Sequence, residues 1–373
     1  MDKIEMVDLT TQYARLKDRI DPAVLRVIGS GCYINGAEVK AFEEQLASYL
    51  GVNHVVACAN GTDALTAALM ALNLQPGDEV ITSAFSFIAT AEAMALLKLK
   101  PVFADIHPRT FNIDPCSIRE KLTPKTKAIV PVHLFGQACP MDEIMAIAKA
   151  HNLYVIEDNA QSLGSTHHNG QKTGTMGHIG CTSFFPSKNL GCMGDGGAIF
   201  TNDESLAKRL RRIVHHGSDR KYHHAEIGMN SRLDTLQAAI LLVKLTELDD
   251  FNARRQRAAA FYTETLKGID HLLTPEVSGH SDHIFHQYTI RVKGGWRDSL
   301  QQYLRKNGVP SMIYYPVPLH HQEVFKALTS RKEELPESEL AANEVLSLPM
   351  HTELTIEQLE HITQTIKQFF ATI

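Results

Sequence analysis

Residues 153–161 read LYVIEDNAQ, a short apolar run that ends in two acids and is followed by Asn, Ala and Gln. Continuous apolar runs of this length are typical of strands buried on both faces, as in the parallel sheets of α/β proteins. Such sheets place functional groups at the carboxyl ends of their strands. We therefore expect Asp158 to lie at this edge of a central sheet, where it either contributes to a site or only caps the turn that follows.

Strands and helices alternate on both sides of this stretch. Further strands are expected at residues 54–59, 79–82, 100–104 and 128–132, and helices at residues 40–50, 63–72, 88–97 and 142–150. This alternation predicts an α/β fold whose mixed, mainly parallel sheet is sandwiched by helices.

The pattern changes after Arg232, where the chain becomes largely helical. The expected elements are helical stretches at residues 233–251 and 254–267, which form either one element or two with a kink near Asn252. A helix at residues 299–306 and a strand at residues 287–292 are also expected. We place a domain boundary near residue 250. It separates a large domain at residues 1–250, which includes the N-terminal segment, from a smaller C-terminal α+β domain at residues 251–373.

Composition narrows the class of function. The 373 residues are 44% hydrophobic and 21% charged, with a net charge of −5 and no long basic run, which argues against nucleic acid or an anionic membrane as the partner. The charged N-terminus does not resemble a secretory signal, and no window of about 18 apolar residues predicts a membrane span. The six cysteines are scattered, as expected for reduced thiols in the cytoplasm.

A lysine with unusual neighbours follows in residues 181–191, CTSFFPSKNLG. Most lysines are solvated surface residues. Lys188, however, has no charged neighbour for several residues, follows aromatic residues and precedes the glycine-rich turn at residues 191–197. A partly desolvated lysine has a lowered pKa and can act as a Schiff-base nucleophile and proton carrier.

Residues 59–65, ANGTDAL, predict a strand, a glycine turn and the start of a helix. Exposed amides at such a helix start can bind an anion, although an ordinary capped helix has the same pattern. The hydroxyl of Ser183 can join this anion site. Phe87 can stack on a ring, although most such aromatic residues belong to the core. Pyridoxal phosphate needs an acid opposite its ring nitrogen, and Asp158 can supply that acid unless it only caps the turn.

The 19 histidines include adjacent pairs at residues 167–168, 215–216, 223–224 and 320–321. The side chains of adjacent residues diverge on a helix or strand, and no H-x-x-x-H or Cys/His cluster is present. We therefore predict no metal site. The glycines near residue 194 do not match a dinucleotide-binding fingerprint either.

Together these segments resemble the nucleotide-sugar aminotransferases of the DegT/StrS type, which have the aspartate-aminotransferase fold. The resemblance extends over nearly the whole chain. It is carried by residues 7–9, 33–36, 60–64, 157–161, 183–188, 228–234 and 315–320.

The resemblance implies pyridoxal 5′-phosphate as cofactor, with pyridoxamine phosphate as its aminated form. The positions it assigns to the cofactor are Gly61, Thr62, Phe87, Asp158, Gln161, Ser183, Lys188 and Asn230. Lys188 would form the Schiff base, Asp158 would pair with the ring nitrogen, and Gln161 would meet the ring hydroxyl. Asn230 would reach the phosphate of the neighbouring subunit, which implies a homodimer with shared active sites.

The resemblance also implies a reaction. Glutamate would give its amino group to the cofactor and leave as 2-oxoglutarate, and the nitrogen would then pass to a nucleotide-linked ketosugar. Among family members, the chain is most similar to those that make a UDP-linked 2-acetamido-3-amino-2,3-dideoxyglucuronate for bacterial surface polysaccharide. The expected substrate residues are Arg232, Tyr314, Tyr315 and His320. One departure stands at residue 314, where Tyr replaces the His expected before Tyr315. Arg232 would either clamp a carboxylate or form a structural pair with Asp234 or another acid.

Three alternatives remain at this point. A 4-keto-6-deoxysugar aminotransferase would have the same cofactor residues. A cofactor-dependent sugar dehydratase of the same family would have replaced the lysine, usually by histidine, and Lys188 argues against it. A non-catalytic regulator with the same fold would have lost a cofactor residue, and none is missing.

Overall fold

The structure is a computed structural model that describes residues 3–326, 328 and 334–372. Its largest sheet has seven strands in the order β1-β7-β6-β5-β4-β2-β3. The strands are β1 (His54–Cys58), β2 (Glu79–Ser83), β3 (Lys100–Ala104), β4 (Thr126–Val130), β5 (Tyr154–Asp158), β6 (Ile179–Ser183) and β7 (Gly197–Thr201). Only β7 runs antiparallel to its neighbours, β1 and β6. The prediction of a mixed, mainly parallel sheet is therefore confirmed, and each predicted strand is present within two residues of its expected ends.

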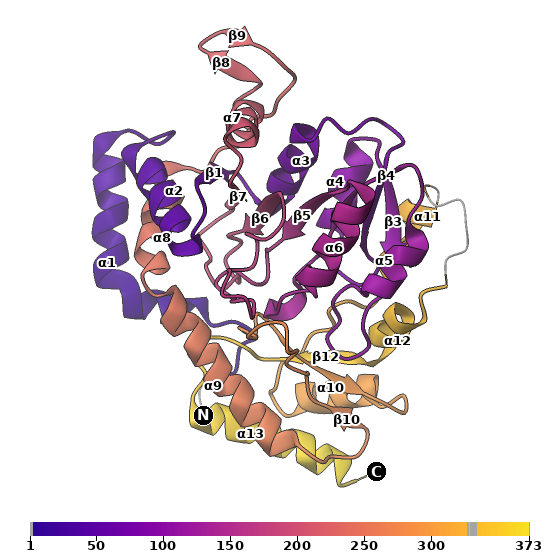
Figure 1. Ribbon diagram of the computed structural model, residues 1–373. Helices are drawn as coiled ribbons and strands as arrows, with labels where there is room; N and C mark the ends of the chain where they lie inside the picture. The colour runs from indigo at the N-terminus through magenta and orange to yellow at the C-terminus, as the bar shows by residue number, and fades with distance from the viewer. Residues whose placement is uncertain (1–2, 327, 329–333, 373) are drawn as a thin grey trace.

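Helices cover both faces of this sheet (Figure 1). One face carries α3 (Gly61–Ala71), α4 (Ala89–Leu96) and α7 (Glu204–Ile213). The other carries α2 (Ala37–Leu50), α5 (Pro115–Lys121), α6 (Met141–His151) and α8 (Thr235–Leu245). The sandwich that the alternating pattern predicts is confirmed.

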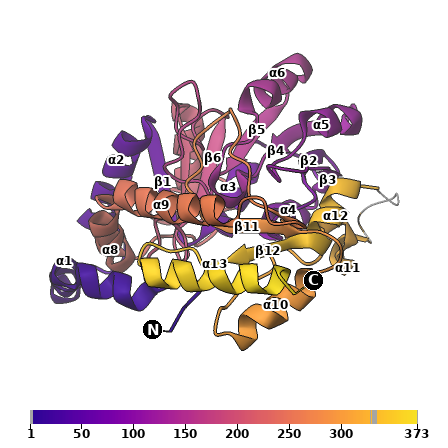
Figure 2. The same cartoon turned by 90° about the horizontal axis from the view of Figure 1, so that it is seen from below.

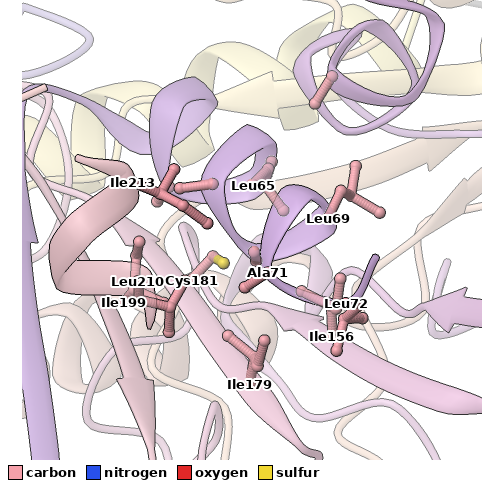
Figure 3. Close-up of a cluster of buried hydrophobic side chains, with 14 of the residues drawn as sticks. Leu65, Leu69, Ala71, Leu72, Ile156, Ile179, Cys181, Ile199, Leu210 and Ile213 are labelled. Atoms are coloured by element: carbon pink, nitrogen blue, oxygen red, sulfur yellow. The ribbon is translucent and has the colours of Figure 1, made fainter. Parts of the chain in front are cut away.

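Strand residues alternate between these two layers because successive side chains of a strand point to opposite faces. Ile156 packs under α3, whereas its neighbour Val155 packs against α6. Figure 3 shows Leu65 and Leu69 of α3 above Ile156 and the neighbouring strands. Both faces of β5 are thus buried, which explains its continuous apolar run and directs its last two residues to the carboxyl edge of the sheet.

The predicted kink near Asn252 is wrong. Helix α8 ends at Leu245 and α9 (Leu248–Leu266) begins three residues later, then runs without a break through Asn252. The Asn252 side chain accepts a hydrogen bond from Asn189 (2.7 Å) and donates to the carbonyl of Leu163 (3.4 Å). Because its amide is engaged outside the helix, it does not compete for the helix's own backbone groups.

A second, antiparallel sheet lies beside the first in the order β10 (Leu272–Leu273), β11 (Tyr288–Val292) and β12 (Val345–Leu348). Helices α9, α10 (Arg297–Lys306) and α13 (Ile356–Phe370) share its hydrophobic core, and Figure 2 shows α13 alongside α9. Ile4, near the N-terminus, joins the same core. Helix α9 contributes Phe251 to one core and Tyr262 to this one, so the predicted boundary near residue 250 falls within a helix that both cores share. The division into two domains stays a prediction.

The remaining described elements are α1 (Leu9–Ser30), η1 (Leu134–Gly136), β8 (Ser218–Arg220), β9 (His223–His224), η2 (Leu319–His321), α11 (Glu323–Lys326) and α12 (Pro336–Glu344). The hairpin of β8 and β9 projects from the body of the protein beyond α7 (Figure 1). Among the helices of the described residues, none is long and apolar enough to cross a membrane.

Candidate active site

A cavity of about 830 Å³ opens at the carboxyl ends of β5 and β6. Segments far apart in the chain line it: the start of α3, the end of β5, the turn after β6 and residues that flank the second sheet. The predicted site residues in its wall are Gly61, Thr62, Phe87, Asp158, Gln161, Ser183, Lys188, Tyr314 and Tyr315. Lys188 and Asp158, predicted from separate motifs, thus face one space.

The environment of Lys188 changes its acidity. Burial by the surrounding protein lowers the pKa of its amine from 10.5 to about 8, while the negative charge of Asp158 acts in the opposite direction. A larger fraction of the amine is therefore neutral and nucleophilic near neutral pH. Burial also lowers the pKa of Lys244 to about 8, but the amine of Lys244 donates to the carbonyl of Gly191 (2.8 Å) and does not line this cavity. A lowered pKa and access to the cavity coincide at Lys188.

The two acids at the end of β5 have different surroundings. Glu157 is fully buried and accepts hydrogen bonds from the backbone amides of Gly174 (2.8 Å), Met176 (2.6 Å) and Gly177. Its second oxygen also lies 2.7 Å from Nε2 of His133. This carboxylate is committed to holding the loop that precedes β6.

Asp158 instead lines the cavity. One carboxylate oxygen accepts from the hydroxyl of Thr90 (2.7 Å) and the other from the amide of Ala160 (3.1 Å). The second bond is the turn cap that the sequence offered as an alternative, so Asp158 caps the turn and also faces the cavity. Each oxygen keeps a further lone pair, which can accept a hydrogen bond from a bound molecule.

The start of α3 forms an anion site next to Lys188. Asn60 caps the helix, because its side chain accepts from the amide of Asp63 (2.8 Å), and the first helical bond joins the amide of Ala64 to the carbonyl of Asn60 (3.1 Å). The amides of Gly61 and Thr62 lie ahead of that bond, at the positive end of the helix dipole.

Gly61 also lies very close to β6. A Cβ atom at residue 61 would stand 2.7 Å from Cβ of Ser183, so a larger residue would displace that serine. The glycine therefore brings the α3 amides and the Ser183 hydroxyl to one point of the cavity wall. This arrangement suits a phosphate group.

Aromatic and amide groups form another part of the wall. Phe87 is 55% exposed, so the alternative that it belongs to the core is wrong, and its ring centroid lies 6.2 Å from that of Tyr315. The Gln161 amide accepts from the backbone of Phe135 (2.8 Å) and donates to the Tyr315 hydroxyl (3.2 Å). Gln161 therefore has one more N–H to offer to a ligand.

The sequence motifs did not identify His286, which also lines the cavity. Burial, followed by the charges of Lys188 and Arg255, holds the pKa of its ring well below the usual range, and its Nδ1 has no hydrogen-bond partner. Arg255 donates to the backbone carbonyls of Phe285 (3.3 Å) and His286 (3.3 Å) and so fixes this segment. His286 precedes β11 by two residues and reaches the site through the packing of the two sheets, which no local pattern reveals.

Three predicted site residues lie outside this cavity. Asn230 is exposed, and Arg232 lines a separate cavity of about 1120 Å³ beside the β8–β9 hairpin. Within the described part of the chain, no ion pair joins Arg232 to Asp234 or to another acid, whereas the nearby Arg209 and Arg212 pair with Glu226. Nε2 of His320, on η2, lies 3.2 Å from a carboxylate oxygen of Glu339. The roles of these three residues stay predictions.

The argument that adjacent histidine side chains diverge is wrong for two pairs. The ring centroids of His167 and His168 are 4.2 Å apart, and those of His320 and His321 are 4.1 Å apart. His167 forms an isolated β-bridge with Ser281 and His168 begins the turn that follows, while the second pair lies in a 3₁₀ helix, so neither pair belongs to a regular strand or α-helix.

The groups in the cavity that holds Lys188 fit pyridoxal phosphate: a lysine amine of lowered pKa, helix amides at the start of α3 for a phosphate, and the carboxylate of Asp158. The family model described as the DegT/DnrJ/EryC1/StrS aminotransferase family matches residues 14–367.

Two relatives match nearly the whole chain. The UDP-2-acetamido-2-deoxy-3-oxo-D-glucuronate aminotransferase of Pseudomonas aeruginosa is 48% identical over 96% of this chain and 98% of its own length. The UDP-N-acetyl-3-dehydro-alpha-D-glucosamine 3-aminotransferase of Acidithiobacillus ferrooxidans is 45% identical over 98% of this chain and 97% of its own length. Among solved structures, NtdA of Bacillus subtilis with bound cofactor PMP has a TM-score of 0.92 at 33% identity, and the match covers 100% of this chain and 86% of that chain.

Proposed function

The chain belongs to the DegT/DnrJ/EryC1/StrS aminotransferase family, and from that premise we propose that it moves an amino group from L-glutamate to a UDP-linked 3-ketosugar with pyridoxal phosphate as cofactor. The observation that carries the proposal is Lys188, whose amine of lowered pKa shares one cavity with Asp158 and the start of α3. The amino sugar formed would be a precursor of bacterial surface polysaccharide.

Each part of the cavity has a proposed task. The amides of Gly61 and Thr62 and the hydroxyl of Ser183 hold the phosphate, Phe87 covers the ring, and Gln161 meets the ring hydroxyl. Asp158 keeps the ring nitrogen protonated by accepting its hydrogen. When bound, pyridoxal phosphate supplies a protonated ring that takes up the electron pair left on a substrate carbon after a proton is removed.

Lys188 has two tasks in this scheme. Its neutral amine would hold the cofactor through nitrogen, with loss of water, and once displaced by the amino donor it would take the proton from the substrate carbon as a general base. A pKa of about 8 suits both tasks, because a base near the working pH accepts a proton and also returns it.

The sugar is assigned from the relatives' substrates and from residues of this chain. Both relatives carry names of UDP-linked 3-keto sugars, one a glucuronate and the other a glucosamine. Tyr314 and Tyr315 line the cavity beside Phe87, where they can face a sugar ring. The charge at C6 is the point on which the two relatives' substrates differ, and Arg232 is the residue that we propose for a carboxylate.

The test is an assay of 2-oxoglutarate release from glutamate with three acceptors: the UDP-linked 3-keto glucuronate, the UDP-linked 3-keto glucosamine and a 4-keto-6-deoxysugar nucleotide. We expect turnover of a 3-keto compound. If the glucuronate is the substrate, Arg232→Gln should lose activity with it through KM while Tyr314→His retains it. Turnover of the 4-keto compound alone would contradict the proposal.

We also propose that two subunits share each active site. Asn230 and Arg232 lie outside the cavity that holds Lys188, next to the projecting β8–β9 hairpin, and a second subunit would bring them to the cavity of its partner. Mixing Lys188→Ala with Asn230→Asp tests this, because each variant alone should be inactive. Random exchange of subunits should restore about 25% of the wild-type activity, since half of the dimers then contain one intact site of two. No recovery after exchange would show that both residues serve the same subunit's site.

A further inference from the structure

A histidine and carboxylate cluster lies outside the cofactor cavity, where the turn at residues 166–172 meets the start of α6. His167, His168 and Asp142 each direct one metal-ligating atom to this point, and all three atoms lie within 4.8 Å of one another. Nε2 of His168 is 3.2 Å from a carboxylate oxygen of Asp142. The three side chains come from two segments of the chain, so the fold and not a local sequence pattern assembles them.

His167 gives an independent sign that this cluster can bind a ligand. Its side chain is 1% exposed, and neither ring nitrogen has a hydrogen-bond partner of acceptable geometry, although Asn169 lies nearby. A buried polar group without a partner costs about 1–3 kcal/mol, so proteins rarely leave one unused.

The ligand types and spacing fit one class of ion. Neutral imidazole and carboxylate bind Zn²⁺, and metal–ligand bonds of about 2.0–2.1 Å in a tetrahedron place neighbouring ligand atoms about 3.3 Å apart. The contact between His168 and Asp142 already has this length, at 3.2 Å. His168 and Asp142 are about half exposed, which leaves a path for the ion and room for a water as fourth ligand.

We propose that Asp142, His167 and His168 bind a divalent transition-metal ion of the Zn²⁺ class. The ion would join α6 to the turn at residues 166–172. That turn is already paired with the segment near residue 280: the amide of His168 donates to the carbonyl of His280 (2.8 Å), and the amide of Thr166 donates to Asp282 (2.8 Å). The same segment continues to His286 and Gln287 in the wall of the cofactor cavity, so the ion would stabilise the support of that wall.

The experiment uses full-length protein, with its cofactor bound, made without a histidine tag and dialysed against a chelator. Zn²⁺ binding is measured by equilibrium dialysis with metal analysis, and Co²⁺ binding by its visible absorption. The variants are His168→Ala and Asp142→Asn, whose exposed side chains can be changed with little loss of packing. His321→Ala is the matched control, because His320, His321 and Glu339 form a second group with ligand atoms within 4.8 Å of one another.

We expect one ion bound per chain in the wild type and in His321→Ala, and binding at least about 10-fold weaker in the two test variants, since even second-shell changes cost that much. Thermal unfolding of the wild type should shift upward with Zn²⁺, and the shift should vanish in His168→Ala. Equal binding by all variants, loss of binding in His321→Ala alone, or no binding by the wild type would each overturn the proposal.

Discussion

The acidity of Lys188 leads to the most quantitative prediction. Only the neutral amine can attack the carbonyl carbon of the cofactor. With a pKa of about 8 instead of the ordinary 10.5, the neutral fraction at pH 7 rises from about 0.03% to about 9%, a factor of about 300. The cofactor-free protein should therefore react with pyridoxal phosphate at neutral pH far faster than an exposed lysine does.

The assay follows the visible absorption of the bound cofactor after mixing, from about pH 6 to about pH 10. The rate constant should rise about tenfold per pH unit at low pH and level off above about pH 8. Nα-acetyl-lysine, whose side-chain amine is free, is measured in parallel in solution and corrects for the titration of the cofactor itself. In Asp158→Asn the plateau should begin at lower pH, because the removed charge is the one that raises the pKa of Lys188. A midpoint at or above about pH 10 in the wild type would refute the reasoning.

Two further predictions concern the supports of the site. Glu157→Gln replaces a buried carboxylate that accepts three backbone hydrogen bonds, so the free energy of unfolding in urea should fall by about 3 kcal/mol or more. The control Glu44→Gln, at an exposed position, should change it by less than about 0.5 kcal/mol. An equal effect of both variants would contradict the role of Glu157 in holding the loop before β6. Gly61→Ala places a methyl group 2.7 Å from Cβ of Ser183 and should weaken cofactor binding at least about tenfold in equilibrium dialysis. The control Gly29→Ala, with no atom within 4 Å of its new Cβ, should leave cofactor binding unchanged and stabilise the chain by up to about 1 kcal/mol. Unchanged cofactor binding in Gly61→Ala would show that the close approach of Gly61 to Ser183 is unimportant.

The sequence predicted the large sheet well because its strands are buried on both faces. A strand such as β5 buries side chains on both of its faces, so its residues form a continuous apolar run. The kink near Asn252 was wrong for the opposite reason. The local sequence shows no partner for the Asn252 side chain, but Asn189 and the carbonyl of Leu163 satisfy its amide, and the helix continues.

The residues of the candidate site also fall into two groups, those that the local sequence predicts and those that depend on tertiary packing. Lys188, Asp158 and Gly61 each lie at or within five residues of the carboxyl end of a strand, β6, β5 and β1 respectively, so each could be predicted locally. His286 could not, because its place beside Lys188 depends on how the second sheet packs against the first. The cluster at His167 was missed since an adjacent pair was assumed to lie on a regular element, whereas the turn lets both rings face Asp142.

The central claim is that Lys188 holds pyridoxal phosphate in a transaminating site, and the visible absorption spectrum of the purified protein, before and after excess glutamate, tests it most directly. The wild type and Lys244→Gln, which changes the other buried lysine of lowered pKa, should show a visible band that bleaches with glutamate, while Lys188→Ala should lack it. A wild-type protein that stays colourless with added pyridoxal phosphate, or a band that survives in Lys188→Ala, would contradict the account.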